Sequence, residues 1–206
     1  MTLTTPPRAR ATVLRTSLVT SLATVALVGA TAALAPVPAR AAVTLDCTSG
    51  PVILADSTED YVLTGACSDV TVTASVVTVS LTSATSLTVS GANVEVTAAG
   101  AVGPVAVSGA NSSVEAAAAP VVRVRASNVD IEIPVLGKAV LVGSNNEVEA
   151  VKGTKAKIKG ANNEVTYRKL RKVVVRGANN TVKVRTGTTK VRVKGANNVV
   201  RVHRRG

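Results

Sequence analysis

The chain has almost no aromatic residues: it contains neither Phe nor Trp, and its two tyrosines are Tyr61 and Tyr167. A globular core usually includes large aromatic side chains. Their scarcity argues against such a core, and the abundance of Val, Ile and Ala favours a thin core built from strands. No aromatic residues lie among the basic residues to stack nucleobases, so we expect no sequence-specific binding of nucleic acid.

Long apolar runs are missing after residue 41. Before it, residues 18–35 are mostly apolar, they follow three arginines, and residues 39–41 have the small-x-small form of a signal-peptidase site. We predict a signal peptide over residues 1–41, with an uncleaved membrane anchor as the alternative. After cleavage no segment is long enough to span a membrane, so we expect a secreted or cell-envelope-associated protein.

Cysteine and histidine are also scarce, since Cys47, Cys67 and His203 are the only three. A catalytic pair of Ser or Cys with His has no support, and a metal site at the cysteines would lack further ligands. In an exported protein two cysteines most simply form one disulfide. We predict that Cys47 and Cys67 form a bridge that caps the first repeat.

The sequence does contain a repeat. The phrase Gly-Ala-Asn, or a near variant, occurs seven times at intervals of 17 or 18 residues. A fixed period of this length is typical of a solenoid, in which each coil buries its apolar face only by stacking on its neighbours. The asparagines of the phrase are Asn93, Asn111, Asn128, Asn145, Asn162, Asn179 and Asn197.

Each repeat contains two short stretches in which apolar and polar residues alternate, which is the pattern of β-strands. Two positions are aliphatic in every repeat: one precedes the glycine site by two residues, and the other follows it by five. We predict an all-β fold, a β-solenoid (single-stranded β-helix) of about eight or nine coils with 17–18 residues each. An antiparallel sandwich is the alternative, and the strict period argues against it.

The repeat also predicts the domain organisation. Residues 42–90 form degenerate N-terminal coils with the disulfide cap, residues 91–203 form the repeat solenoid, and residues 204–206 are a basic tail. Residues 72–77 match the register of residues 89–94 but lack the asparagine.

The repeated corner has its own mechanics. Glycine accepts left-handed backbone angles and asparagine tolerates them next best. We predict that the seven asparagines stack as a structural ladder of hydrogen-bonded amides, at steps of ~4.8 Å. A second, shorter ladder is predicted for Asn146, Asn163, Asn180 and Asn198. The alternative is that the asparagines face a ligand.

The leading peptide, the early cysteine pair and the repeated Gly-x-Asn-Asn-x-Val phrase resemble a family of exported actinobacterial proteins, catalogued as domain of unknown function 3060 (DUF3060). The resemblance covers roughly residues 43–203 and depends mainly on the C-terminal repeats, such as residues 177–182. It implies the solenoid architecture and an exported location. It implies no activity and no catalytic residues.

Charge is distributed unevenly along the chain. Residues 42–122 contain seven acids and no Lys or Arg, whereas residues 123–206 contain twenty bases and five acids. Eight of these bases fall at outward positions on the strand before the corner in three successive repeats, and we name them the basic face. They are Lys155, Lys157, Lys159, Lys172, Arg176, Lys190, Arg192 and Lys194. They predict a polyanion-binding strip, or alternatively a solvated face that maintains solubility.

Acidic residues gather on the strand after the corner. Asp130, Glu132, Glu147 and Glu149 form what we name the acidic cluster, with Glu115 and Glu164 beside it. Paired carboxylates suit Ca²⁺ or acid–base catalysis. A solvated stripe, neutralised by Arg123 and Arg125, is the alternative.

The favoured hypothesis is a secreted or envelope-associated solenoid without catalytic activity or cofactor. Its basic face would contact an anionic envelope polymer or an anionic lipid surface. The alternative function is a glycan-acting enzyme or Ca²⁺-dependent binder that uses the acidic cluster. Self-association through the open C-terminal coil is a third prediction.

Overall fold

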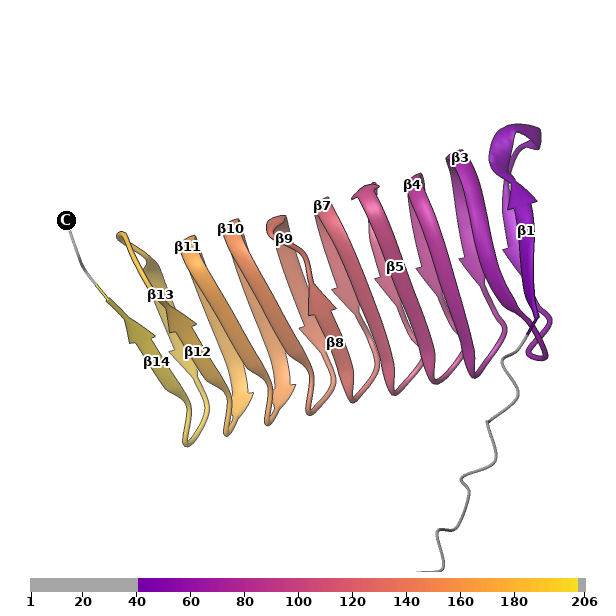
Figure 1. Cartoon of the computed structure of the whole chain (residues 1–206). Helices are drawn as coiled ribbons and strands as arrows, with labels where there is room; N and C mark the ends of the chain where they lie inside the picture. Colours follow the sequence, from indigo (N-terminus) through magenta and orange to yellow (C-terminus); the bar gives the residue numbers. More distant parts are fainter. Residues whose placement is uncertain (1–40, 204–206) are drawn as a thin grey trace, which may run out of the picture. The chain divides into compact units, whose positions relative to one another are not determined.

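The computed structural model describes residues 41–203, and these form a regular stack of β-coils that runs from β1 to β14 (Figure 1). The predicted signal peptide, apart from Ala41, and the basic tail lie outside the described residues. The elements are β1 (Ala42–Asp46), η1 (Cys47–Ser49), β2 (Val52–Leu54), β3 (Asp60–Val72), β4 (Val77–Val89), β5 (Val94–Ala101), β6 (Val105–Val107), β7 (Ser112–Val124), β8 (Val129–Glu132), β9 (Val135–Val142), β10 (Glu147–Ala161), β11 (Glu164–Ala178), β12 (Thr181–Val184), β13 (Lys190–Lys194) and β14 (Val199–Val202).

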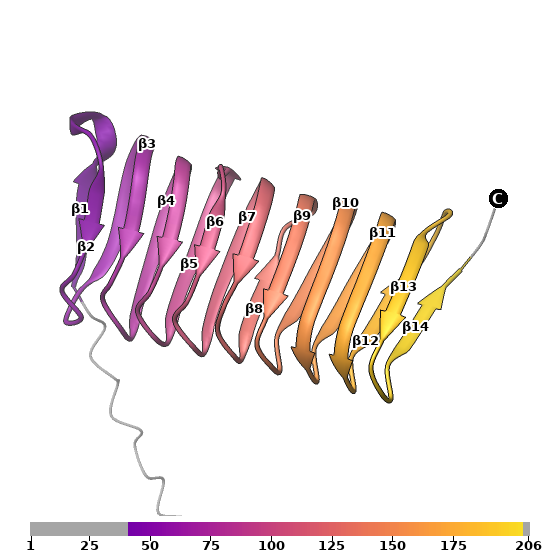
Figure 2. The same ribbon diagram turned by 180° about the vertical axis from the view of Figure 1, so that it is seen from behind.

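The predicted β-solenoid is confirmed. All 14 strands are linked in one sheet, each strand pairs in parallel with its equivalents one coil away, and there are about nine coils. The coils keep the same order in the view from behind (Figure 2). The described residues contain no helix that is long and apolar enough to cross a membrane.

The register follows the sequence period. Between β10 and β11 the shift is 17 residues, so Val148 pairs with Val165 and Ile158 with Val175. The early coils obey the same rule, because Val72 pairs with Val89 and Val77 with Val94, as predicted. Equivalent positions of successive coils therefore form columns that run along the solenoid.

The two predicted aliphatic columns form the core. Their members have exposures of 0% or 1% in every coil before the last one, where Val193 is 40% exposed. The columns are Val89, Val107, Val124, Leu141, Ile158, Val175 and Val193, and Val96, Val114, Ile131, Val148, Val165, Val182 and Val200. Burial of branched aliphatic side chains from neighbouring coils is thus the main stabilising contribution between coils.

One large side chain interrupts this uniform core. Tyr167 is completely buried, and its ring occupies the space left by Gly153 in the preceding coil, where an added Cβ would lie 2.4 Å from Tyr167 Cε1. Burial raises the pKa of Tyr167, and its hydroxyl has no hydrogen-bond partner within residues 41–203.

The predicted disulfide is confirmed: Cys47 in η1 is bonded to Cys67 in β3. Both cysteines are 3% exposed and belong to the continuous core. The bridge therefore links the first coil to the second, at the end of the stack where a coil has a neighbour on one side only.

The corners differ in detail from the prediction. All seven asparagines of the repeated phrase adopt left-handed angles, with φ between 52° and 57°. Val76 occupies the equivalent position of an earlier coil and has φ 60°. The glycine is needed for two reasons: Gly143, Gly160, Gly177 and Gly195 have φ between 114° and 147°, as predicted, and a Cβ on Gly177 would lie 1.8 Å from the carbonyl oxygen of Gly160.

The shorter ladder predicted for Asn146, Asn163, Asn180 and Asn198 is confirmed, whereas the prediction of a seven-residue ladder on the first asparagine of each pair is wrong. Within residues 41–203, one hydrogen bond joins side chains of the first column, from Asn128 Nδ2 to Asn111 Oδ1. The second column is continuous, because the amides of Asn146, Asn163 and Asn180 each donate to the next at 2.9–3.0 Å, ending at Asn198. The left-handed angle leaves the first side chain exposed, whereas the second is buried under the corner.

Candidate functional site

The stretch of each coil before the corner carries the basic face; in β10 and β11 it is the second half of one continuous strand, whose first half follows the previous corner. On the outward side of this stretch the register forms three parallel columns, which continue through β10, β11 and β13. In the first column Lys155 pairs with Lys172, and Lys172 with Lys190. The third contains Lys159, Arg176 and Lys194, and the middle one has Val174 between Lys157 and Arg192. The structure therefore brings together all eight bases that the sequence pattern selected.

This face contains a ninth base that was not predicted from the sequence. Lys138 in β9 pairs with Lys155 and extends the first column to four consecutive lysines. Arg123 and Arg125 lie further along the same face, because Arg123 pairs with Val140, which itself pairs with Lys157. The signal was present in the sequence, since Lys138 precedes Lys155 by one period.

The bases are close enough to repel each other. Strands of one sheet are ~4.8 Å apart, so the charges of a column are held near that distance unless the side chains splay. The positive charge of Lys159, together with burial and with Arg176, Lys155 and Lys138, lowers the pKa of Lys157. A negatively charged partner over this face would remove that repulsion.

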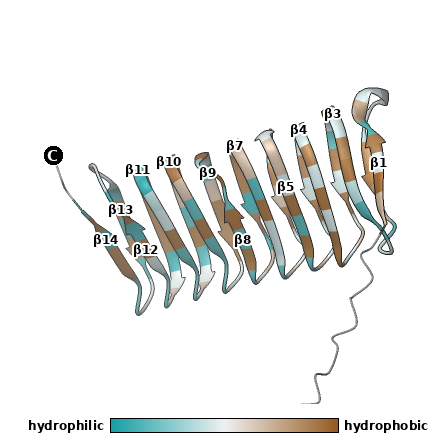
Figure 3. Ribbon diagram, viewed as in Figure 1, coloured by the Kyte–Doolittle hydropathy of each residue, from teal (hydrophilic) through white to brown (hydrophobic). Residues whose placement is uncertain are grey.

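The positive charge is concentrated in the C-terminal coils. Hydrophilic residues become frequent toward β10, β11 and β13, whereas β3, β4 and β5 are mostly hydrophobic or intermediate (Figure 3). Further bases, Lys152, Lys169 and Arg171, line a hollow of about 340 Å³ beside the middle of strands β10 and β11. They were not predicted from the sequence because they do not follow the regular alternation of buried and outward residues.

The strand after each corner carries the acidic cluster, in two columns. The register places Glu147 beside Asp130 and Glu149 beside Glu132, as predicted. Glu164 continues the first column and Glu115 begins the second. Burial and the negative charges of Asp130, Glu164 and Glu149 raise the pKa of Glu147, while Lys183 lowers it.

The bases that contact these acids are not the predicted ones. Lys183 Nζ lies 2.6 Å from Glu164 Oε1, and Arg185 Nη2 lies 3.7 Å from Glu149 Oε1. Arg123 pairs with Ala106 and Val140 in the stretch before the corner, whereas the acids lie in the stretch after it, so the prediction that Arg123 and Arg125 neutralise the cluster is wrong. The ion pairs are exposed, and pairs of this kind contribute little stability.

The acidic cluster lacks the arrangement of a metal site. Among residues 41–203, no group of three or more His, Cys, Asp or Glu side chains is placed to hold a metal ion. The outward carboxylates of a flat sheet diverge into solvent, whereas Ca²⁺ needs oxygen ligands that converge to 2.3–2.6 Å.

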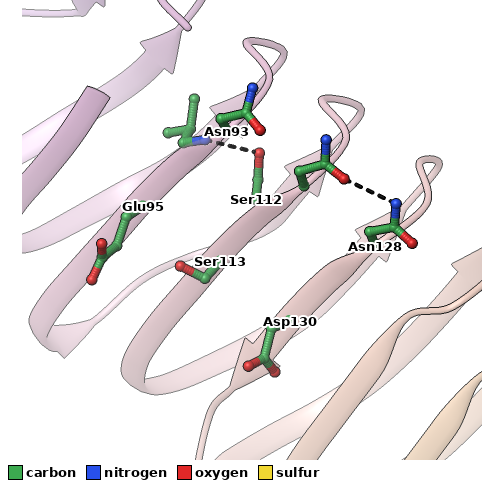
Figure 4. Close-up of a pocket in the computed structure, with 8 residues that line it drawn as sticks. Asn93, Glu95, Ser112, Ser113, Asn128 and Asp130 are labelled. Carbon is green, nitrogen blue, oxygen red and sulfur yellow. Dashed lines mark hydrogen bonds between the residues drawn. The ribbon is translucent and has the colours of Figure 1, made fainter. Parts of the chain in front are cut away.

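A hollow of about 410 Å³ lies at the start of the acidic columns (Figure 4). Ser113 forms its floor because its short side chain stands between Glu95 and Asp130 in the same column. Asn93, Asn111 and Asn128 line its rim. The two carboxylates are two strands apart, ~10 Å, so they are too far apart to share one cation.

Comparison with known proteins supports the family resemblance over the C-terminal coils. Residues 158–206 match the model of the family described as Protein of unknown function (DUF3060). The comparison with curated proteins gives no match, and the comparison with solved structures gives none. The matched segment includes most of the basic face and the last three rungs of the amide ladder, Asn163, Asn180 and Asn198.

Proposed function

We propose that this protein is a non-catalytic binding module of the cell envelope or extracellular space, whose basic face binds an anionic polymer. The observation that carries this proposal is the uninterrupted column formed by Lys138, Lys155, Lys172 and Lys190. A stack of like charges is unfavourable in the free protein, and a polyanion is the partner that turns this repulsion into attraction.

The geometry favours a polymer over a small anion. Positive charges recur at ~4.8 Å across the strands and at ~6.6 Å along each strand, on the outward side of the sheet. A repeating polyanion engages many such sites together, and binding through many weak contacts is strong and depends steeply on salt. Phosphate-bearing and sulfated or carboxylated polymers share the required chemistry.

Two further features support an exported location. The disulfide between Cys47 and Cys67 is typical of proteins that mature in an oxidising compartment. The sequence before residue 42 has the composition of a signal peptide. An envelope protein meets anionic polymers and anionic lipid headgroups at high local concentration.

The proposal is tested with protein secreted by an exporting host, its N-terminus determined by mass spectrometry. Binding to polyphosphate and to heparin is measured over a salt series, and binding to vesicles with and without phosphatidylglycerol tests the lipid surface. We expect affinity that falls steeply as salt rises. The variant with Lys157, Arg176, Arg192 and Lys194 changed to Glu should lose this affinity.

A matched control separates the basic face from net charge. Changing Lys152, Arg168, Lys169 and Arg171 to Glu reverses the same number of charges away from the basic face, at exposed positions of β10 and β11 that take part in neither ion pair. Retained binding in the control and lost binding in the first variant would support the proposal. Equal loss in both variants, or no binding by the unmodified protein, would reject the basic face as the binding surface.

A further inference from the structure

Among the described strands that precede a corner, β13 comes last in the chain, and one of its edges is unpaired. β13 pairs with β11 on one side, and within residues 41–203 no strand pairs with its other side. All five residues of β13 are exposed, including Val191 at 45% and Val193 at 40%.

The preceding coil shows what this edge lacks. Val173 and Val175 occupy the same two columns as Val191 and Val193, and both are completely buried. The difference is the neighbouring strand, since β13 lies over β11 and nothing described lies over β13. A further strand added to β13 would bury Val191 and Val193 in the same way.

The side chains of β13 define the chemistry of that strand. Lys190, Arg192 and Lys194 alternate with the two valines and point to the opposite face of the strand. In a strand added beside β13, every second side chain would lie on the side of the two valines. The remaining side chains would lie on the side of the three bases, at ~4.8 Å from them. Apolar residues suit the first set and acidic residues suit the second. Basic residues on an edge repel other basic edges, which restricts pairing to acidic partners.

We propose that the outer edge of β13 binds an extended acidic peptide segment, with apolar residues at alternate positions, by strand addition. In this mode main-chain hydrogen bonds supply affinity and alternate side chains supply specificity. The coil itself accepts this pattern, since Glu147-Val148-Glu149 in β10 alternates in the same way with Val148 buried. The inference goes beyond the proposed function because it depends on backbone groups and on the two valines, which a polyanion does not use.

A second copy of this chain fits the edge less well. Two β13 edges would bring together the same three bases and repel each other. The corresponding strand of the first coil, β2, is Val52-Ile53-Leu54 and carries no acidic residue. An acidic partner of separate origin therefore matches β13 better than either end of the solenoid does.

The first test uses the secreted protein and a fluorescein-labelled Glu-Val-Glu-Val-Glu peptide, with affinity measured by fluorescence anisotropy at one salt concentration. A peptide of the same composition in the order Glu-Glu-Glu-Val-Val should bind weaker by about tenfold or more, because it cannot place both valines over the core. Equal affinities would mean that charge alone attracts the peptide, and would overturn the proposal.

Backbone methylation gives a sharper test. Two versions of the alternating peptide carry N-methyl groups on the odd or on the even residues. A strand presents alternate N–H groups to its two edges, so one version should lose binding and the other should keep it. If the surface attracts the peptide without strand pairing, the two methylated versions should bind with equal affinity, and that result would overturn the proposal.

Protein variants separate this inference from polyanion binding. Val191→Ser together with Val193→Ser should lower the affinity for the alternating peptide and leave the affinity for heparin unchanged. Lys157→Glu together with Arg176→Glu should lower the affinity for heparin and leave the affinity for the alternating peptide unchanged. Circular dichroism checks that each variant folds. Unchanged peptide affinity in the double serine variant would overturn the proposal. Self-association of the protein, seen by sedimentation and reversed by the peptide, would also overturn it, because the edge would then bind a second copy of the chain.

Discussion

The early and late coils of the solenoid share one backbone and one register, yet differ on their outward surfaces. The column that contains Lys157 and Arg192 begins with Ile53, Thr71 and Thr88. These three neighbours are uncharged and stack without electrostatic repulsion. In the late coils the same sites hold bases. The comparison shows that the buried columns determine the fold, while the outward columns vary with little effect on it.

The corners of the early coils also differ from those of the late coils. The position after the corner asparagine is Val94, Ser112 and Val129 in the early and middle coils, and it is asparagine from Asn146 onward. The buried amide ladder therefore spans the coils in which bases are stacked. We interpret the ladder as cohesion between coils that offsets repulsion across the basic face.

The largest effect is expected from breaking this ladder. Asn163→Ala removes an amide whose Oδ1 accepts from the backbone N–H and the side chain of Asn146, and whose Nδ2 donates to Gly143 and Asn180. Several buried groups lose their partners at once, so we expect a loss of about 3 to 5 kcal/mol in the free energy of unfolding. Urea unfolding followed by circular dichroism measures it.

Two controls make this test specific to the ladder. Asn162→Gly changes the exposed neighbour at a φ that glycine tolerates, so stability should change by less than about 0.5 kcal/mol. Ser112→Ala removes an isolated hydroxyl from the same column, which accepts from the N–H of Val94, and should cost about 1 to 2 kcal/mol. If Asn163→Ala costs no more than Ser112→Ala, the ladder contributes no special cohesion.

The core and the register were predictable from the sequence because both follow from one period. Val148, Val165 and Val182 recur at 17-residue steps within an alternating pattern, and parallel stacking is the arrangement that buries them all. The basic face was predictable for the same reason, since its residues alternate with the buried ones.

The shorter ladder was predicted correctly, but the main ladder was assigned to the first asparagine of each pair, because both asparagines recur with the same period. Which of them is buried depends on the backbone angle of the first, and that angle is a property of the folded corner. The partners of the acids were missed for another reason. Lys183 follows Thr166 by one period, but its contact with Glu164 crosses from one column to the next.

A second test transfers the corner of the late coils to an early one. Val76 has φ 60°, an angle that a β-branched residue adopts only with strain, and its side chain is 54% exposed. Val76→Asn should therefore raise the free energy of unfolding by about 1 kcal/mol. Val62→Asn is the matched control, because Val62 is an exposed valine within strand β3, where asparagine is disfavoured. Stabilisation by both changes would mean that the left-handed corner is not its source.

The smallest effect concerns the acidic columns and tests whether stacked like charges destabilise the late coils. Because the pKa of Glu147 is raised, its ionised form is disfavoured in the folded state. The protonated form therefore contributes stability below the normal carboxyl range, and that stability is lost as the pH rises through the raised pKa. Glu147→Gln should increase the urea midpoint slightly at pH 7, and the gain should vanish near pH 4. Glu95→Gln is the control, because Glu95 stands between the uncharged Thr78 and Ser113 in the same column and should give no comparable gain. An equal increase of the urea midpoint in both variants would show that stacked like charges do not destabilise the late coils more than the early ones. It would mean that solvent and salt screen the repulsion along the whole outward surface.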